Sequence, residues 1–193
     1  MPSYRADYTG GYLCVAVDDQ TLGDRGDRLI AELFNGGAER MNPADPTAPF
    51  DVVSHRHRIG AEVKTMRLKP GQDWQEKKPS LKYGAKARKV LSGKEQELTP
   101  GTYVVLVDDT GTARVFERPG TAEFRLKTMR HVATVDLKAG RVEWHRRWLF
   151  EEDAEGYRLA AKREAAAARK RSIKLQSEIR SRQRAGIGSE RKG

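Results

Sequence analysis

The segment TYVVLV, residues 102–107, restricts the fold of this chain more than any other feature of the sequence. Its apolar side chains do not alternate with polar ones, which is typical of a strand inside a sheet that is covered on both faces. The next residues, DDTGTARVFER, have the composition of a turn followed by another strand. Residues 102–118 are therefore predicted to form a hairpin whose first strand lies centrally in a sheet.

The rest of the chain shows both helix and strand patterns, which predicts an α/β (α+β) fold with a mixed central sheet flanked by helices. Apolar residues at helical spacing between Leu29 and Phe34 predict a helix over residues 23–35. FDVVSHR and RIGAEVKTM predict a second hairpin, with its turn near Arg56 and His57. Further elements are expected as a strand or helix start at 11–17, helices at 80–92 and 121–131, a hairpin at 133–148 and a basic helix at 152–185.

Length and composition favour one globular core with a basic extension. The 193 residues are 37% hydrophobic, which suits a domain over residues 1–150, followed by a basic helical tail over 151–193 with a disordered end. The only cysteine, Cys14, excludes a disulfide within the chain and favours a reducing, cytoplasmic location. The N-terminus lacks a signal-peptide pattern and no run of 18 apolar residues occurs, so neither export nor membrane insertion is expected.

The positive charge of the chain is concentrated near its C-terminus. Residues 157–193 hold 12 Lys and Arg against 3 Asp and Glu, whereas residues 1–156 hold 25 against 24. A basic tail on a near-neutral body indicates a polyanionic partner, most often nucleic acid. Arg169, Lys170 and Arg171 are the candidate contacts in this tail. A solubilising tail without a specific partner is the alternative.

The hairpin predicted over residues 50–66 carries charges in unusual places. A turn centred between Arg56 and His57 places Asp51 directly opposite Glu62, with Cβ atoms about 5 Å apart. Lys64 follows Glu62 by two residues and shares its face of the strand, while Ala61 and Val63 point to the other face. Opposed carboxylates repel, so one takes up a proton or a cation lies between them.

A hard divalent ion such as Mg²⁺ or Mn²⁺, bound by Asp51 and Glu62, satisfies this arrangement. Lys64 would then position a water molecule and offset the charge of a phosphate, as phosphodiester hydrolysis requires. Asp27, on the apolar side of the first predicted helix, is a third candidate ligand. The alternative for Asp27 is an acid that favours the helix N-terminus, and for the hairpin a solvated face.

These residues resemble the motif of the PD-(D/E)XK nuclease superfamily, whose members share a restriction-endonuclease-like fold. Asp51 starts one strand, eleven residues ahead of Glu62, and the EVK triplet of Glu62, Val63 and Lys64 lies in the next. The preceding LGDRGDRLIAELF is similar to the Gly-x-x-Gly-acid helix of resolvase-like members, in which Asp27 takes the place of the helix acid. The resemblance covers residues 20–118.

The resemblance implies a metal-dependent nuclease that hydrolyses phosphodiester bonds in DNA, with endonuclease favoured over exonuclease. The catalytic residues would be Asp51, Glu62, Lys64 and Asp27, with the three acids as metal ligands. A homodimer is possible, since cutting both strands often requires two sites. The alternatives are a non-catalytic nucleic-acid-binding protein on a nuclease-like scaffold, and an adaptor whose basic helix binds an acidic partner.

Additional cations precede and line the helix predicted at 80–92. They are placed to contact nucleic-acid phosphates, with a plain solvated helix face as the alternative. His55 and His57 are interpreted as turn residues near a phosphate rather than zinc ligands. Trp144 and Trp148 are candidates for base stacking or, more commonly, for core packing. The candidate cations of this region are Lys77, Lys78, Lys82, Lys86 and Lys89.

Overall fold

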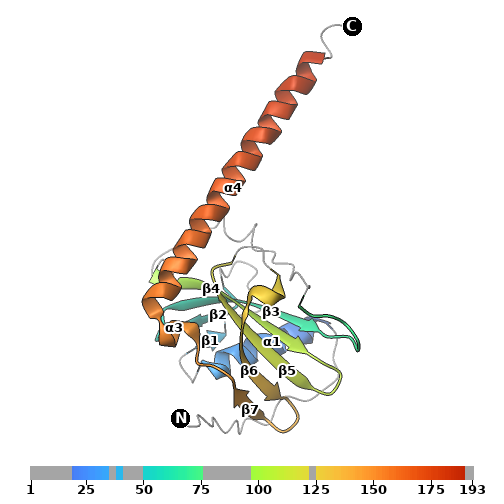
Figure 1. The fold of residues 1–193 in the computed structure, drawn as a ribbon, viewed down its shortest axis with the longest axis vertical. Coiled ribbons are helices and arrows are strands. Elements are labelled where there is room, and N and C mark those ends of the chain that lie inside the picture. The colour runs from blue at the N-terminus through green and yellow to red at the C-terminus, as the bar shows by residue number, and fades with distance from the viewer. Residues whose placement is uncertain (1–18, 35–37, 41–49, 76–96, 122–124, 190–193) are drawn as a thin grey trace.

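A computed structural model describes residues 19–34, 38–40, 50–75, 97–121 and 125–189 (Figure 1). The predicted strand at 11–17, the predicted helix at 80–92 with its lysines, and the last four residues of the tail lie outside the described residues.

A single mixed sheet forms the body, which confirms the predicted fold class at this level. Its strands lie in chain order, from β1 at one edge to β7 at the other. Only β3 and β4 are parallel, and every other neighbouring pair is antiparallel. The strands are β1 (Glu39–Arg40), β2 (Val52–Ser54), β3 (Ile59–Arg67), β4 (Thr99–Val107), β5 (Thr112–Pro119), β6 (Arg130–Asp136) and β7 (Arg141–Trp144).

The strand β4 is central and buried, as the run TYVVLV predicted. Its side chains alternate between two apolar clusters, so both faces of the sheet are covered at this strand. Tyr103 and Val105 belong to the cluster on the side of the first helix, whereas Val104 and Leu106 pack with Phe116 and with residues outside the sheet. The absence of polar alternation in the sequence reflects this two-sided burial.

The helix α1 (Asp19–Leu33) covers one face of the sheet. Leu29, Ile30 and Leu33, together with Phe34 just beyond the helix, are buried against the strands, as their helical spacing predicted. The closest approach is at Gly26, where a Cβ atom would lie 1.7 Å from Oγ1 of Thr65 in β3. The absence of a side chain at Gly26 therefore brings α1 directly onto β3.

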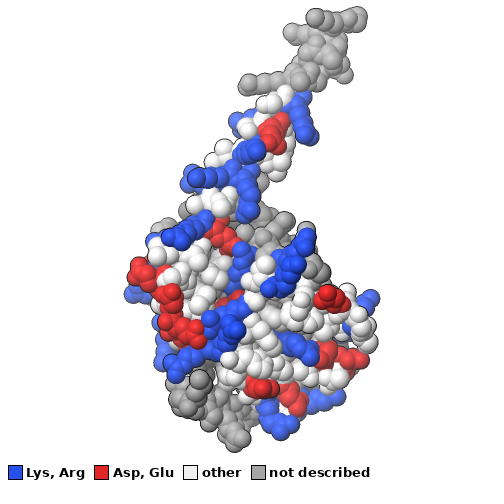
Figure 2. Space-filling model, in the orientation of Figure 1, with Lys and Arg blue, Asp and Glu red and all other residues white. Residues whose placement is uncertain are grey.

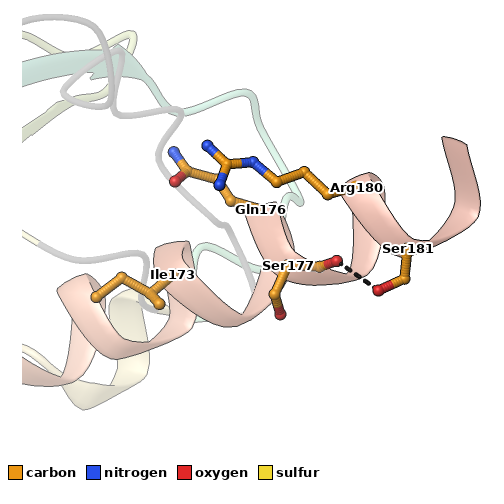
Figure 3. Close-up of a pocket in the computed structure, with 5 residues that line it drawn as sticks. All are labelled: Ile173, Gln176, Ser177, Arg180 and Ser181. Carbon is orange, nitrogen blue, oxygen red and sulfur yellow. Dashed lines mark hydrogen bonds between the residues drawn. The ribbon is translucent and has the colours of Figure 1, made fainter. Parts of the chain in front are cut away.

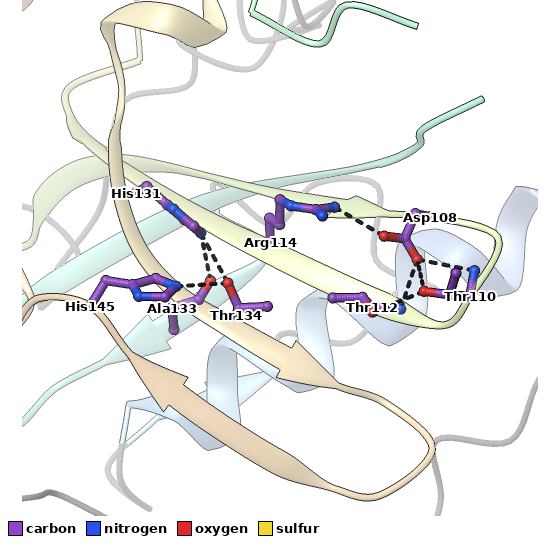
Figure 4. A network of polar contacts seen from close by, with 8 residues as sticks. All are labelled: Asp108, Thr110, Thr112, Arg114, His131, Ala133, Thr134 and His145. Carbon is purple, nitrogen blue, oxygen red and sulfur yellow. Dashed lines mark hydrogen bonds and ion pairs between the residues drawn. The ribbon is translucent and has the colours of Figure 1, made fainter. Parts of the chain in front are cut away.

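The three predicted hairpins are confirmed. β2 and β3 are joined by residues 55–58, β4 and β5 by 108–111, and β6 and β7 by 137–140. In the second turn, the Asp108 carboxylate accepts hydrogen bonds from the backbone N–H groups of Thr110 and Thr112 and forms an ion pair with Arg114 (Figure 4). These bonds fix the turn, because they replace the backbone partners that a tight turn leaves unpaired.

The C-terminal part begins inside the core and then leaves it. The 3-10 helix η2 (Leu126–Thr128) and the short helix α3 (Leu149–Glu152) precede α4 (Ala154–Ser189), which has 36 residues. Phe150, Tyr157 and Ala161 are buried, so packing of the core continues beyond residue 150. After this docked base, α4 projects away from the body (Figure 1). In the described part of the chain, no helix combines the length and apolarity needed to cross a bilayer.

Candidate functional site

Pairing between β2 and β3 has the predicted register from Val52 onward. Val52 pairs with Ala61 and Val53 with Gly60, as expected from the sequence. Asp51 precedes β2 and its backbone bonds to Ala61 rather than to Glu62, so the predicted pairing of Asp51 with Glu62 was wrong. The Asp51 N–H donates to the Ala61 carbonyl at 2.9 Å, and Oδ2 of Asp51 accepts the Val63 N–H at 2.9 Å. Asp51 is thus held against β3 by both its backbone and its side chain.

The entry of the chain into β2 is fixed by Phe50. A Cβ atom at Gly60 would lie 2.4 Å from the Phe50 ring, so the ring lies directly on this glycine. The turn before β3 contains Arg58 with φ 55°, in the left-handed region, and its carbonyl accepts the Thr99 N–H at 2.7 Å. These contacts position the ends of β2, β3 and β4 around Asp51 and Glu62.

Glu62 and Lys64 share the face of the sheet opposite α1. Ala61 and Val63, between and beside them, belong to the apolar cluster beneath α1, as predicted. Met66, two residues after Lys64, packs into the cluster on the other side. Glu62 is 8% exposed and Lys64 is half-buried, so neither is a freely solvated surface charge.

Glu62 belongs to a row of paired residues that crosses the sheet toward α4. Glu62 pairs with Thr102 in β4, and Thr102 pairs with Arg118 in β5. Paired residues on neighbouring strands point to the same face. Arg118 forms an ion pair with Glu164 of α4. Because neighbouring strands lie about 4.8 Å apart, the anchor of α4 lies two strands from Glu62, on the order of 10 Å.

The structure does not add Asp27 to the two hairpin acids. Asp27 lies in α1, which packs on the opposite face of the sheet through Gly26 and Thr65. Within the described ranges, no three His, Cys, Asp or Glu residues gather into a group that could hold a metal ion. The described arrangement is therefore Asp51 held beside β3 by Ala61 and Val63, with Glu62 and Lys64 in that strand.

No protein-family model, curated protein or solved structure matches this chain.

The basic candidates divide between α4 and the segment outside the described residues. Lys77, Lys78, Lys82, Lys86 and Lys89 all lie in that segment. Arg169, Lys170 and Arg171 are exposed on α4 beyond its docked base. Figure 2 shows Lys and Arg side chains along the projecting helix, with few acidic ones among them.

The histidines and tryptophans of the sequence have mainly packing roles. Trp148 is 1% exposed, and its Nε1–H donates to the Leu33 carbonyl at 3.3 Å. Its ring is therefore inaccessible to bases, as the commoner use of tryptophan predicted. His57 contacts the rings of Phe34 and Phe150, with centroid distances of 6.5 and 5.1 Å. His55 is exposed.

A pair of histidines on β6 and near β7 was not singled out from the sequence. The rings of His131 and His145 lie 4.5 Å apart, and both contact the Thr134 hydroxyl (Figure 4). Burial and the neighbouring His145 lower the pKa of His131, which favours its neutral imidazole. Only the register of β6 and β7 brings these residues together.

Glu117 is a buried carboxyl group that sequence reasoning missed. Its side chain is 1% exposed on the α1 side of β5, where Oε2 accepts the Leu149 N–H at 2.7 Å. Oε1 has no hydrogen-bond partner. Burial raises the pKa of Glu117 to about 8, although the Leu149 N–H and the Arg130 charge act in the opposite direction. The alternation Ala113, Val115, Glu117 was the signal that could have shown its inward direction.

Proposed function

We propose that this protein is a metal-dependent hydrolase of phosphodiester bonds in DNA, with Asp51, Glu62 and Lys64 as its catalytic residues. The supporting observation is that Asp51 is held against β3 by Ala61 and Val63, the two neighbours of Glu62, with Lys64 one pleat along from Glu62. A restriction-endonuclease-like sheet and a cytoplasmic location are part of this proposal. The order of elements also agrees with the family resemblance. An acid is followed by a strand, then by the strand that carries the acid-x-Lys triplet, and then by a strand parallel to it.

The carboxylate oxygens of Asp51 and Glu62 are suitable ligands for Mg²⁺ or Mn²⁺. Magnesium in phosphate-processing sites is often held by one or two carboxylates together with waters and substrate oxygens, so a third protein ligand is not required. Asp51 and Glu62 would hold the ion, which when bound supplies a more acidic water and offsets phosphate charge. Asp51 is bonded to the residues on either side of Glu62, so the two acids belong to the same short stretch of the hairpin.

The chain's own residues supply orientation and charge. Asp51 is fixed by its hydrogen bond from the Val63 N–H, so its carboxylate keeps one direction relative to β3. Lys64 would donate hydrogen bonds to the attacking water or to a phosphate oxygen, and partial burial strengthens this interaction.

A plasmid-nicking assay tests this proposal. Wild-type protein is expected to nick supercoiled DNA with Mg²⁺ or Mn²⁺ but not with EDTA, and Lys64→Ala should reduce the rate by about 10²-fold or more. Asp51→Asn and Glu62→Gln should also abolish the rise in melting temperature that millimolar Mg²⁺ produces by binding the folded state. Asp27→Asn serves as the matched carboxylate variant, because Asp27 lies on the other side of the sheet. Equal activity of Lys64→Ala and wild type would contradict the proposal.

A non-catalytic nucleic-acid-binding protein on the same scaffold is the second candidate. It is favoured by the use of Oδ2 of Asp51 as an acceptor for the Val63 N–H, which gives this acid a structural role. It is also favoured by the absence of a three-ligand group among the described residues. Salt-sensitive DNA binding without cleavage in either metal would select this candidate.

A further inference from the structure

The projecting part of α4, residues 165–189, is named the arm. Its cations form an arc on the helix, since successive residues are turned by about 100°. Arg169 and Arg180 lie on one flank, because residues 11 apart return to nearly the same side after three turns. Arg171 and Arg182 form the opposite flank by the same spacing. All four side chains are exposed.

Lys170 and Lys174 lie between the two arginine flanks. Lys174 forms a 4.0 Å ion pair with Glu178, the acid on this side of the arm. The far side of the arm carries an apolar stripe that includes Leu175 and Ile179, which are 58% and 47% exposed. This stripe continues the side of α4 that docks on the body through Tyr157 and Ala161. The cationic arc is therefore directed away from the docked side, with one arginine pair on each flank.

We infer that the arm binds double-stranded DNA by lying in its major groove, with one arginine pair on each phosphate wall. This inference rests on the proposed function for the identity of the polyanion. A helix with its side chains is about 10–12 Å across, and the major groove of B-DNA is about 12 Å wide. The arm's 25 residues extend about 37 Å, close to the 34 Å of one duplex turn.

The composition of the arm disfavours single strands. Proteins that bind single-stranded nucleic acid stack bases on aromatic side chains, and no aromatic residue follows Tyr157 in the sequence. The deep, narrow major groove of A-form RNA excludes a helix of this width. Duplex DNA is the polyanion that fits both the composition and the diameter of the arm.

The residues between the flanks indicate binding without sequence preference. The Ser177 hydroxyl donates to the Lys174 carbonyl at 2.7 Å and the Ser181 hydroxyl to the Ser177 carbonyl at 2.9 Å. These hydroxyls are thus engaged within the helix (Figure 3). Gln176 and Arg180 extend together toward one flank, away from the middle of the arc (Figure 3). Contacts to phosphates rather than to base edges are expected.

The docked base of α4 connects the arm to the candidate site. Glu164, at the start of the projection, pairs with Arg118, which lies in the row of Glu62 and Thr102. A duplex held by the arm would therefore approach the body from the end of the sheet that carries Asp51 and Glu62.

Fluorescence anisotropy in EDTA, with 24-bp duplex DNA, the matching single strand and duplex RNA, tests the inference without cleavage. Duplex DNA should bind at least 10-fold more tightly than the other two. Arg169→Ala with Arg180→Ala, and separately Arg171→Ala with Arg182→Ala, should each reduce the slope of log affinity against log salt by about 1.8. The control pair Lys138→Ala with Arg141→Ala removes two exposed cations of the body and should leave the slope unchanged.

If only one of the two arginine-pair variants reduces the salt slope, the inference is overturned. The arm would then contact the duplex through one flank and would not lie in the groove. Equal affinity for the single strand, or binding to anionic lipid vesicles with the same dependence on both pairs, would also overturn it. If Lys64→Ala binds duplex DNA but wild type does not nick it, the hydrolase proposal is wrong and the inference about the arm stands. If both arginine-pair variants bind duplex DNA like wild type and nicking is normal, the inference about the arm is wrong and the hydrolase proposal stands.

Discussion

Individual buried charges decide how this protein responds to pH, and Glu117 is the clearest case. In the folded state its pKa is about 8, whereas a solvated glutamate titrates near 4.5. Between these values the folded state binds one more proton than the unfolded state. Stability therefore falls as pH rises through this window, by on the order of 5 kcal/mol in total.

Replacing Glu117 by Gln should remove this pH dependence. The variant stays neutral and keeps an acceptor for the Leu149 N–H, so its free energy of unfolding should match wild type near pH 5. It should exceed wild type by about 1.4 kcal/mol for each pH unit between 5 and 8. Urea unfolding at several pH values measures the difference. The exposed Glu97→Gln is the control, and parallel pH profiles for wild type and Glu117→Gln would refute the argument.

The register of β2 against β3 was predictable from the sequence, because it follows from the centre of a short turn. Its extension to a pair of Asp51 with Glu62 was wrong, because the Asp51 N–H bonds to the Ala61 carbonyl. The inward direction of Glu117 and the contact of His131 with His145 depend on pairs between strands that are not determined by one turn's centre. Glu117 and the histidine pair were therefore not predicted from the sequence.

At the scale of elements, the contact between α1 and β3 depends on one glycine. Gly26→Ala would place a Cβ atom 1.7 Å from Thr65 Oγ1 and should destabilise the protein by about 1–3 kcal/mol. Gly23 lies in the same helix, where a Cβ atom meets nothing within 4 Å. Gly23→Ala should therefore stabilise by about 0.5–1 kcal/mol, from helix propensity alone.

A double variant separates packing from propensity at this contact. Thr65→Ala removes the hydroxyl that the new methyl group would meet, so adding it to Gly26→Ala should recover most of the loss. Chemical unfolding of the four proteins in the cycle provides the coupling energy. Additive effects of the two substitutions would show that Gly26 is required for another reason.

Helices and strands were predicted correctly where the sequence pattern is local. The end of the core was not, because it depends on how α4 packs on the body. The hairpins over 102–118 and 133–148 follow from their turn residues, including Gly111 and Gly140, which adopt positive φ. The long C-terminal helix follows from its Ala, Lys, Arg and Glu content. The boundary of the core could not be read from the charge pattern, because Tyr157 enters the core from within the basic region.

At the scale of the whole molecule, the position of Tyr157 determines where the chain can be shortened. Its ring is 1% exposed, and its hydroxyl lies 3.0 Å from that of Tyr103. Ala161 is buried next to it, and Glu164 pairs with Arg118. The body therefore includes the first three turns of α4, and these turns also provide the nucleus from which the arm continues as a helix.

Two truncations test this division of the molecule. Removing residues 165–193 deletes no buried side chain of the described core, so the free energy of unfolding should stay within about 0.5 kcal/mol of wild type. Removing residues 157–193 also takes away Tyr157 and leaves a cavity beside Tyr103, which should cost about 3–5 kcal/mol. Urea unfolding followed by tryptophan fluorescence compares the two, because Trp148 lies in the same cluster.

The shorter truncation also separates folding from binding. It removes all seven Lys and Arg residues of the arm, so the slope of log affinity for duplex DNA against log salt should fall by up to about 6 while the body stays folded. Nicking by the remaining Asp51, Glu62 and Lys64 should then require higher DNA concentrations but retain its dependence on Mg²⁺, because the acids belong to the hairpin and the arm supplies affinity alone. Loss of the metal dependence together with the arm would show that α4 contributes to the chemistry as well as to binding.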